Sequence, residues 1–294
     1  MMLAITTPSK EKAGEKTSIR LTKQPWLMQD NPATLDKQRA KESRHISLRM
    51  LVYHQNSPIS KEIEVYARHL SNLLDGQLTY YVTETQANIN FNDLANQKNQ
   101  NLVIFGEPSR SWVKQLFKDP AGCKAVKRLP MSVLVVRQPH WPLQKILLIT
   151  QGYETDNVAV DWLLRLIQPD NTAVTVLALG PEMSPVYQQA MIDMPRGLSE
   201  WLTTSSPLGQ QLHRIAERLE NWDIEEHLRF RQGSSEQQIQ NEVDEGDYDL
   251  IVIAADPTDW WRRRLLGEVI NPLLRWSERS VLVAKPIISQ EVLI

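Results

Sequence analysis

The chain has 294 residues, with 33 Lys and Arg against 35 Asp and Glu and a formal net charge of −2. This balance argues against an overall basic protein of the kind that binds nucleic acid. No apolar run reaches the roughly 18 residues that span a bilayer, so we expect no membrane-spanning segment.

The N-terminal region carries no pattern of a folded element. Residues 1–46 are rich in Lys, Thr, Gln and Asp and show no sustained helical or strand periodicity, so we expect a disordered tail there. Its first five residues are too short for the apolar region of a signal peptide. Cys123 is the only cysteine, which excludes disulfides within the chain. We expect a cytoplasmic protein.

The first ordered region is expected over residues 47–139, where apolar runs short enough for buried strands alternate with one clear amphipathic helix. The expected strands are Leu48–His54, Gln77–Glu84, Leu102–Phe105 and Val133–Arg137, and the expected helices are Ser60–Leu74 and a segment after Asp119. A short segment with two prolines, residues 138–143, then links this region to the next.

The second region, residues 143–288, repeats the order of elements and is longer. Strands are expected at Lys145–Thr150, Ala173–Leu179, His227–Arg231, the run before Ala254 and Val281–Lys285, with helices at Thr155–Ile167 and Pro207–Asn221. The first region has 89 residues from Arg49 to Arg137, and the second has 141 from Lys145 to Lys285. The missing length fits one connection, one helix and one strand, so we expect a reduced four-stranded domain followed by a complete five-stranded one.

Two segments show that the regions are an internal repeat. Residues 101–137 (NLVIFGEPSRSWVKQLFKDPAGCKAVKRLPMSVLVVR) and 249–285 (DLIVIAADPTDWWRRRLLGEVINPLLRWSERSVLVAK) align without a gap at an offset of 148 residues. Each begins with a buried strand, continues through a loop into a helix, and ends with a second apolar strand.

This repeated spacing resembles the universal stress protein family. In that family a buried strand ends in Gly-x-x-Gly, nine residues follow, and Gly-Ser or Gly-Thr opens a helix. In the second copy these positions are Ala254, Pro257, Gly267 and Glu268, and in the first they are Gly106, Ser109, Asp119 and Pro120. One of the four positions matches in each copy.

The resemblance implies a fold and an arrangement of the two copies. We expect α/β domains with a doubly wound parallel sheet of the adenine nucleotide alpha hydrolase-like type, as the alternation of strands and helices also indicates. Because family members pair their domains along the last strand, we expect an intramolecular pseudo-dimer joined by Val133–Arg137 and Val281–Lys285. A homo-oligomer or another protein is a further possible partner.

The resemblance also places a ligand crevice in the second domain, where the winding of the sheet reverses. The residues at the corresponding family positions are Thr150, Gln151, Gly152, Ala178, Leu179, Ala254, Gly267 and Glu268. Gln151 stands where nucleotide-binding members carry an acid. It has two interpretations: a hydrogen-bonding group for a ribose or base, or a cap for the following turn.

The phosphate-binding chemistry of the family is largely missing. Phosphates bind to backbone N–H groups at a helix start, which glycine lets them approach. Pro257 has no N–H, and Glu268 places a carboxylate near the expected phosphate position. Asn271-Pro272 is typical of an N-cap followed by a first-turn proline, so we expect the helix to supply its own cap. Arg262, Arg263 and Arg264 lie in the same loop and offer a rebuilt anion site as the alternative.

No catalytic or metal-binding pattern is present in the sequence. The six histidines show no metal-ligand spacing, and the motifs of serine hydrolases and P-loop enzymes are absent. We therefore expect a non-enzymatic regulatory or scaffold protein of the stress-response type, without a cofactor. The alternatives are an adenine-nucleotide sensor that binds ATP or AMP, and an enzyme of the wider nucleotide-binding α/β superfamily.

Overall fold

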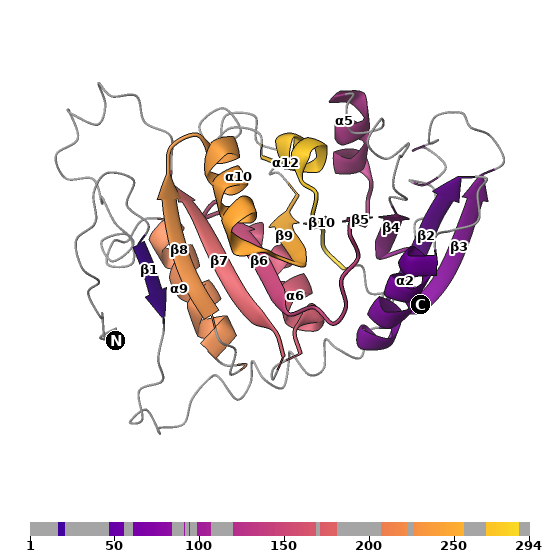
Figure 1. The fold of residues 1–294 in the computed structure, drawn as a ribbon, viewed down its shortest axis with the longest axis horizontal. Helices are drawn as coiled ribbons and strands as arrows, with labels where there is room; N and C mark the ends of the chain where they lie inside the picture. Colours follow the sequence, from indigo (N-terminus) through magenta and orange to yellow (C-terminus); the bar gives the residue numbers. More distant parts are fainter. Residues whose placement is uncertain are drawn as a thin grey trace, which may run out of the picture.

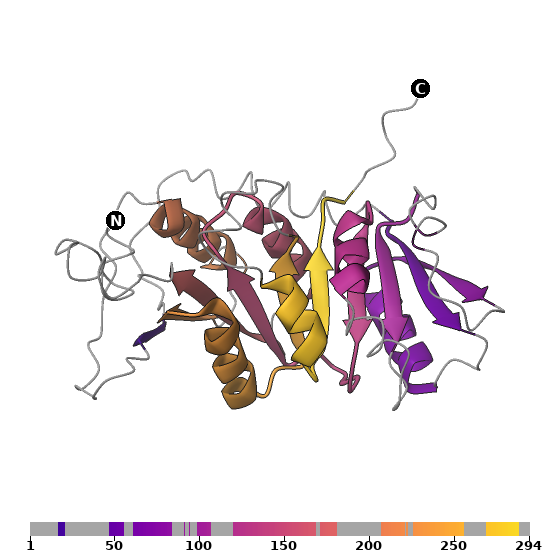
Figure 2. The same ribbon diagram turned by 90° about the horizontal axis from the view of Figure 1, so that it is seen from above.

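The fold is a long, mostly parallel sheet with helices on both faces (Figures 1 and 2). The computed structural model describes residues 17–20, 47–55, 61–83, 91, 94, 99–106, 120–168, 171–180, 207–220, 222, 226–255 and 269–287. The strands are β1 (Thr17–Arg20), β2 (Arg49–Gln55), β3 (Gln77–Thr83), β4 (Leu102–Gly106), β5 (Ser132–Val136), β6 (Lys145–Thr150), β7 (Ala173–Gly180), β8 (Glu226–Gln232), β9 (Leu250–Ala254) and β10 (Ser280–Ala284). The longer helices are α2 (Lys61–Leu73), α5 (Pro120–Arg128), α6 (Asp156–Leu166), α9 (Pro207–Glu220), α10 (Ser235–Gly246) and α12 (Ile270–Trp276).

The sheet runs through the whole molecule in the order β1-β8-β7-β6-β9-β10-β5-β4-β2-β3, so that β1 and β3 lie at opposite ends (Figure 1). Neighbouring strands are parallel within each half. The antiparallel pairs are β1 with β8 and β10 with β5. The predicted doubly wound α/β fold is therefore confirmed, and each predicted strand lies within a residue or two of its expected bounds.

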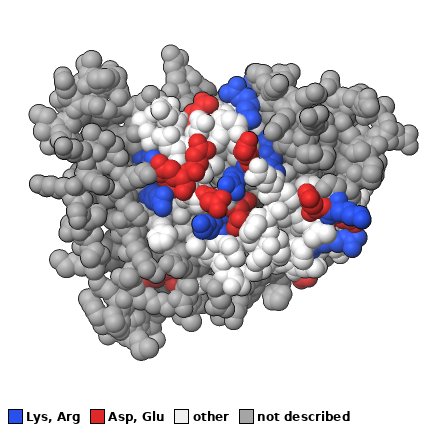
Figure 3. Space-filling view, in the orientation of Figure 1, with Lys and Arg blue, Asp and Glu red and all other residues white. Residues whose placement is uncertain are grey.

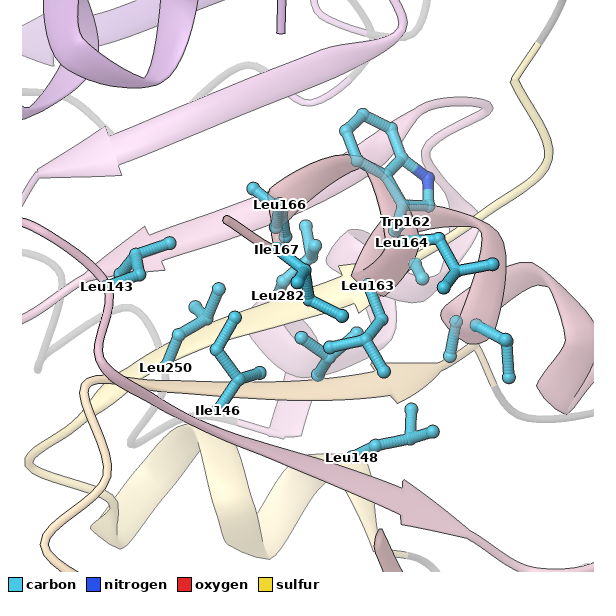
Figure 4. Packing of buried hydrophobic residues seen from close by; sticks show 14 of the residues in the cluster. Leu143, Ile146, Leu148, Trp162, Leu163, Leu164, Leu166, Ile167, Leu250 and Leu282 are labelled. Carbon is cyan, nitrogen blue, oxygen red and sulfur yellow. The ribbon is translucent and has the colours of Figure 1, made fainter. Parts of the chain in front are cut away.

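Alternate residues of each strand enter two separate cores, because successive side chains of a strand point to opposite faces. On one face α2, α6 and α9 cover residues such as Ile146 and Leu148, and on the other α5, α10 and α12 cover residues such as Leu147 and Ile149. Figure 4 shows the packing around α6 in the first of these cores. Trp162 is completely buried there, and its Nε1 donates a hydrogen bond to the carbonyl oxygen of Lys285 at 3.0 Å.

The two halves join through their equivalent last strands, β5 and β10, which pair as if related by a local twofold axis. In the antiparallel pair of β5 and β10, Leu134 lies opposite Leu282, and these are equivalent positions of the internal repeat. Val133 lies opposite Val283 and Val135 opposite Val281. The predicted pairing of the two last strands is thus present, and it has the self-complementary form of an isologous interface within one chain.

Equivalent serines close both ends of this strand pair. The backbone N–H of Arg137 donates to Ser280 Oγ at 3.1 Å, and that hydroxyl donates to the carbonyl oxygen of Arg137 at 2.9 Å. Ser132, the equivalent of Ser280, makes the same two bonds with the backbone of Lys285, at 2.8 and 3.2 Å. All four residues are buried, so the polar groups at both ends of the interface are paired.

Two equivalent basic residues, Arg137 and Lys285, also link each half to a helix of the other half. The Arg137 guanidinium donates to the carbonyl oxygens of Ser277 and Leu274, at and just beyond the end of α12, at 2.5 and 2.6 Å. The Lys285 ammonium donates to the carbonyl oxygens of Val126, Lys127 and Leu129 at the end of α5. Each half therefore caps the free carbonyls of a helix in the other half, where cations are favoured by the helix dipole. Burial lowers the pKa of Lys285 to about 8.

The segment between the halves is held by contacts with both of them. His140 Nδ1 lies 2.9 Å from the Asp249 carboxylate, whose other oxygen accepts hydrogen bonds from the backbone N–H groups of Gln144 and Lys145. The Trp141 ring stacks on His69 of α2, with ring centroids 5.3 Å apart. The linker thus fixes the approach of one half to the other.

One prediction for the N-terminal region is wrong. We expected residues 1–46 to form a disordered tail, whereas residues 17–20 form β1, which pairs antiparallel with β8 from Thr17 opposite Phe230 to Arg20 opposite His227. The physical reason is the edge of β8, whose backbone N–H and C=O groups need partners, and a short stretch with β-branched Thr17 and Ile19 supplies them.

Candidate functional site

The ends of three neighbouring strands meet at the position where the sequence analysis expected a ligand crevice. Thr150 at the end of β6 lies opposite Ala178 of β7, and Ile149 lies opposite Ile253, the residue before Ala254 in β9. Because β7 and β9 flank β6 on opposite sides, the winding of the second half reverses here. The structure thus brings together Thr150, Ala178 and Ala254, whereas Pro257, Gly267 and Glu268 lie outside the described residues.

A buried carboxylate that the sequence analysis did not single out organises the turn after β6. Oδ2 of Asp156, the first residue of α6, accepts a hydrogen bond from the Thr150 hydroxyl at 2.6 Å. The same oxygen accepts hydrogen bonds from the backbone N–H groups of Gln151, Gly152 and Tyr153 at 3.0, 3.0 and 3.1 Å. The free donors of this turn are therefore taken up by the chain's own anion.

The electrostatics of Asp156 reflect two opposing effects. Burial raises the pKa of its carboxyl, while the hydrogen bonds from Thr150 and the three backbone N–H groups act in the opposite direction. Such an acid at the first position of a helix also interacts favourably with the helix dipole. The signal in the sequence was an Asp six residues after the strand-end Thr150, inside a segment predicted as helix.

Gly152 has a packing role in this turn. Its φ is +82°, and a Cβ added there would lie 2.8 Å from the Cα of Leu208 in α9. Leu208 is buried, so any larger residue at position 152 would push α9 away from the turn. Gln211 of the same helix donates from Nε2 to Asn157 Oδ1 at 3.0 Å, which ties α9 to the start of α6.

The side chains of three other predicted site residues belong to the cores. Ala178 and Leu179 are 0% and 2% exposed and point into opposite cores, and Ala254 is 6% exposed. They therefore offer a crevice ligand mainly their backbone. The N–H of Ala255, the residue after β9, donates to the carbonyl oxygen of Ala284 at 2.9 Å and is not free.

Gln151 does not cap the turn through its amide nitrogen. Its Nε2 is buried and has no hydrogen-bond partner, and the capping is done by Asp156. A buried amide nitrogen without a partner carries a desolvation cost, which a hydrogen bond to an acceptor would offset.

The prediction for Asn271 is also wrong. We expected Asn271 to be the N-cap, but α12 begins at Ile270 with Val269 before it, so Asn271 lies inside the first turn. Pro272 does lie in the first turn, as predicted. Asn271 is buried, and its Oδ1 has no partner. In the first copy, α5 begins at Pro120, directly after Asp119, where the helix was predicted.

A second group of charged residues lies between β8 and α10 and has a structural role. Glu242 is completely buried and accepts hydrogen bonds from Arg229, Arg231 and Tyr248, while Arg231 also bonds Glu245 at 3.0 Å. Burial and the Glu242 bond raise the pKa of Tyr248. In Figure 3, acidic and basic side chains are mixed over the described part of the face shown, so that part of the face carries no basic stripe for nucleic acid.

The described part of the chain lacks a metal-binding cluster and a membrane-spanning helix. It contains no group of three or more His, Cys, Asp or Glu side chains that could hold a metal ion. None of its helices is long and apolar enough to cross a membrane.

Comparison with known proteins identifies the second half. The model of the universal stress protein family matches residues 142–285. The comparison with curated protein sequences finds no match.

Several solved structures are similar to the chain. A universal stress protein from Archaeoglobus fulgidus DSM 4304 is 12% identical, with a TM-score of 0.52 over 81% of this chain and 96% of that one. A protein of Pseudomonas aeruginosa UCBPP-PA14 assigned to the universal stress proteins is 14% identical, with a TM-score of 0.48 over 88% and 90%. A universal stress protein solved in complex with cAMP is 21% identical, with a TM-score of 0.32 over 49% and 97%.

The strand order of the second half, the reversal at β6 and the matching family model agree. Residues 142–285 of this chain belong to the universal stress protein family.

Proposed function

We propose that this chain is a non-enzymatic regulatory or scaffold protein of the stress response in the cytoplasm, and that its second domain does not bind ATP in the usual way of the family. The observation that carries the proposal is the turn after β6, where Asp156 Oδ2 accepts three backbone N–H groups and the Thr150 hydroxyl. An anionic ligand that needed these donors would have to displace a buried carboxylate.

The loop after β9 supports the same conclusion from the sequence. Pro257 removes one N–H, Ala254 and Glu268 replace a glycine and a hydroxyl residue, and Glu268 adds a negative charge. A carboxylate at the family's phosphate position would repel the phosphates of a nucleotide, unless cations compensate it. The domain therefore keeps the fold of a nucleotide-binding protein without the donors that hold phosphates.

Three described groups with a shifted pKa have structural partners, which supports a non-enzymatic role. Asp156 holds a turn, Tyr248 bonds Glu242, and Lys285 caps a helix. The proposed activity is thus carried by surfaces, with another protein as the partner and no resident cofactor.

Titration calorimetry with Mg-ATP tests the proposal. The wild-type protein is expected to give no binding heat at millimolar nucleotide. The combined variant Gln151→Asp, Ala254→Gly, Pro257→Gly and Glu268→Ser is expected to bind, since each recovered contact with an anion contributes about 1–3 kcal/mol. Tight binding by the wild type would overturn the proposal, and a folded variant that ignores ATP would show that these four side chains are not what prevents binding.

A second candidate function is an adenine-nucleotide sensor, which one observation favours. Gln151 Nε2 is a buried donor without a partner at the strand reversal. A ribose hydroxyl or a ring nitrogen of adenine would satisfy it without touching the phosphate positions. AMP is the probe: binding of AMP by the wild type that is lost in Gln151→Leu, which cannot donate, would favour this candidate over the first.

A further inference from the structure

The two ends of the sheet differ in the strands that cover them. β7 of the second half is covered on its outer side by β8, and β8 in turn by β1. The equivalent strand of the shorter first half is β3, which pairs with β2 and is the last strand of the sheet among the described residues. The sheet of the first half thus ends at β3, whereas the sheet of the second half continues beyond the equivalent strand, β7.

The β3 edge lacks the features that usually protect an edge strand. Its sequence, QLTYYVT, contains no charged residue and no proline. Natural proteins usually blunt free edges with lysines, prolines or bulges, because unpaired N–H and C=O groups attract another strand. A seven-residue strand without them is suited to pairing.

Exposed apolar side chains gather at the same edge. Val65 and Tyr80 are the large hydrophobic residues that stand exposed in the described part of the chain, at 51% and 40%. Val65 belongs to α2 and Tyr80 to β3, and these two elements are in contact. Arg68, one turn after Val65, hydrogen-bonds both Tyr80 and Glu64, so α2 and the strand edge form one surface.

We propose that the β3 edge is a dimer interface that binds the β3 edge of a second copy of this chain in antiparallel orientation. Tyr80 is the central residue of the strand, so a twofold axis beside it would pair Tyr80 with Tyr80 and leave all seven residues matched. Two aromatic side chains that face each other across strands contribute to such pairing.

The charges next to the edge also fit a second copy. Glu64 and Arg68 lie in that order along α2, with side chains 2.5 Å apart. A twofold axis reverses the order in the partner, so the glutamate of one copy meets the arginine of the other rather than its own kind. The joint of β5 and β10 shows that antiparallel pairing of equivalent strands already works within this chain.

Sedimentation velocity over a range of concentrations tests the oligomeric state of the full chain. The wild type is expected to form a concentration-dependent dimer. Val65→Lys, at an exposed helix position, is expected to weaken the dimer at least tenfold, because the twofold axis brings the new charges together. Gln240→Lys, exposed on α10 far along the sheet from β3, is the matched control and is expected to dimerise as the wild type does.

Cysteine crosslinking tests the register. The native Cys123 is buried, so Tyr80→Cys adds one accessible thiol close to its copy across the axis and is expected to give a covalent dimer on mild oxidation. Gln240→Cys is expected to give no covalent dimer under the same conditions.

Three outcomes would overturn the proposal. A wild type that stays monomeric at all concentrations would do so. A dimer that survives Val65→Lys and gives no Tyr80→Cys crosslink would place the interface elsewhere. Stoichiometric binding of a different protein that is released by Val65→Lys would show that the edge serves another occupant.

Discussion

A single carboxylate, Asp156, decides the chemistry of the crevice. It is 4% exposed, and its Oδ2 accepts the four donors that would otherwise face a ligand after β6. Charge-assisted hydrogen bonds of this kind stabilise a turn by more than neutral ones do. The residue that stabilises this turn therefore also occupies its backbone donors.

Replacement of Asp156 is expected to cost stability. Asp156→Ala removes the acceptor of the Gln151 and Tyr153 N–H groups and of the Thr150 hydroxyl, and leaves the Gly152 N–H only its longer bond to Thr150 Oγ1, 3.3 Å. The free energy of unfolding should therefore fall by about 2–4 kcal/mol in urea denaturation. Asp156→Asn keeps one carbonyl oxygen in the same position and should lose less than half of that amount. Equal losses in both variants would mean that the charge, and not the acceptor, holds the turn.

At the scale of the elements, the sequence predicted strands better than turns. Apolar runs such as Lys145–Thr150 and the 148-residue repeat give strand positions and the β5–β10 pairing, because both depend on short-range patterns. β1 was missed because four residues with weak periodicity become a strand only beside the edge of β8. This strand is therefore determined by its tertiary contact with β8 and not by a local sequence pattern.

The sequence predicted which strand ends lie together, but not which residue holds the turn after β6. Thr150, Ala178 and Ala254 do meet, because the ends of parallel strands lie at one edge of a sheet. The roles of Gln151 and Asn271 depended on the positions of helix starts, which sequence patterns locate only to within a few residues. The acceptor proved to be Asp156, inside the first turn of α6.

Lys285 and Arg137 allow a test of the joint between the halves through pH. The pKa of Lys285 is lowered from 10.5 to about 8 in the folded state, so between these values the unfolded chain binds more protons and stability rises with pH. From pH 7.5 to 9.5, the unfolding free energy of the wild type should therefore rise by about 1–2 kcal/mol relative to that of Lys285→Met.

Arg137→Met is the matched control, because arginine does not titrate in this range and occupies the equivalent position. Its gap from wild type should stay constant with pH. A constant gap for Lys285→Met as well would mean that the lysine keeps an ordinary pKa in the fold.

At the scale of the whole molecule, one sheet and two continuous cores unite the halves. The core that contains Leu134 of the first half also contains Leu282 of the second, and the capping bonds of Arg137 and Lys285 cross between halves. Neither half buries its joining strand alone. Shared burial of this kind makes unfolding cooperative.

We expect a single unfolding transition, with tryptophan fluorescence and far-ultraviolet circular dichroism changing at the same urea concentration. The small-angle scattering profile should fit one compact particle per chain. Two separate transitions, or a profile of two lobes that move freely, would show that the joint of β5 and β10 is weak in solution.

The central claim is that this chain keeps the universal stress protein fold without the family's usual use of ATP. The most direct measurement is the release of small molecules by heat from the purified native protein, followed by absorbance at 260 nm and mass analysis. The account predicts no nucleotide in stoichiometric amount. Adenine nucleotide released at close to one molecule per chain would contradict it.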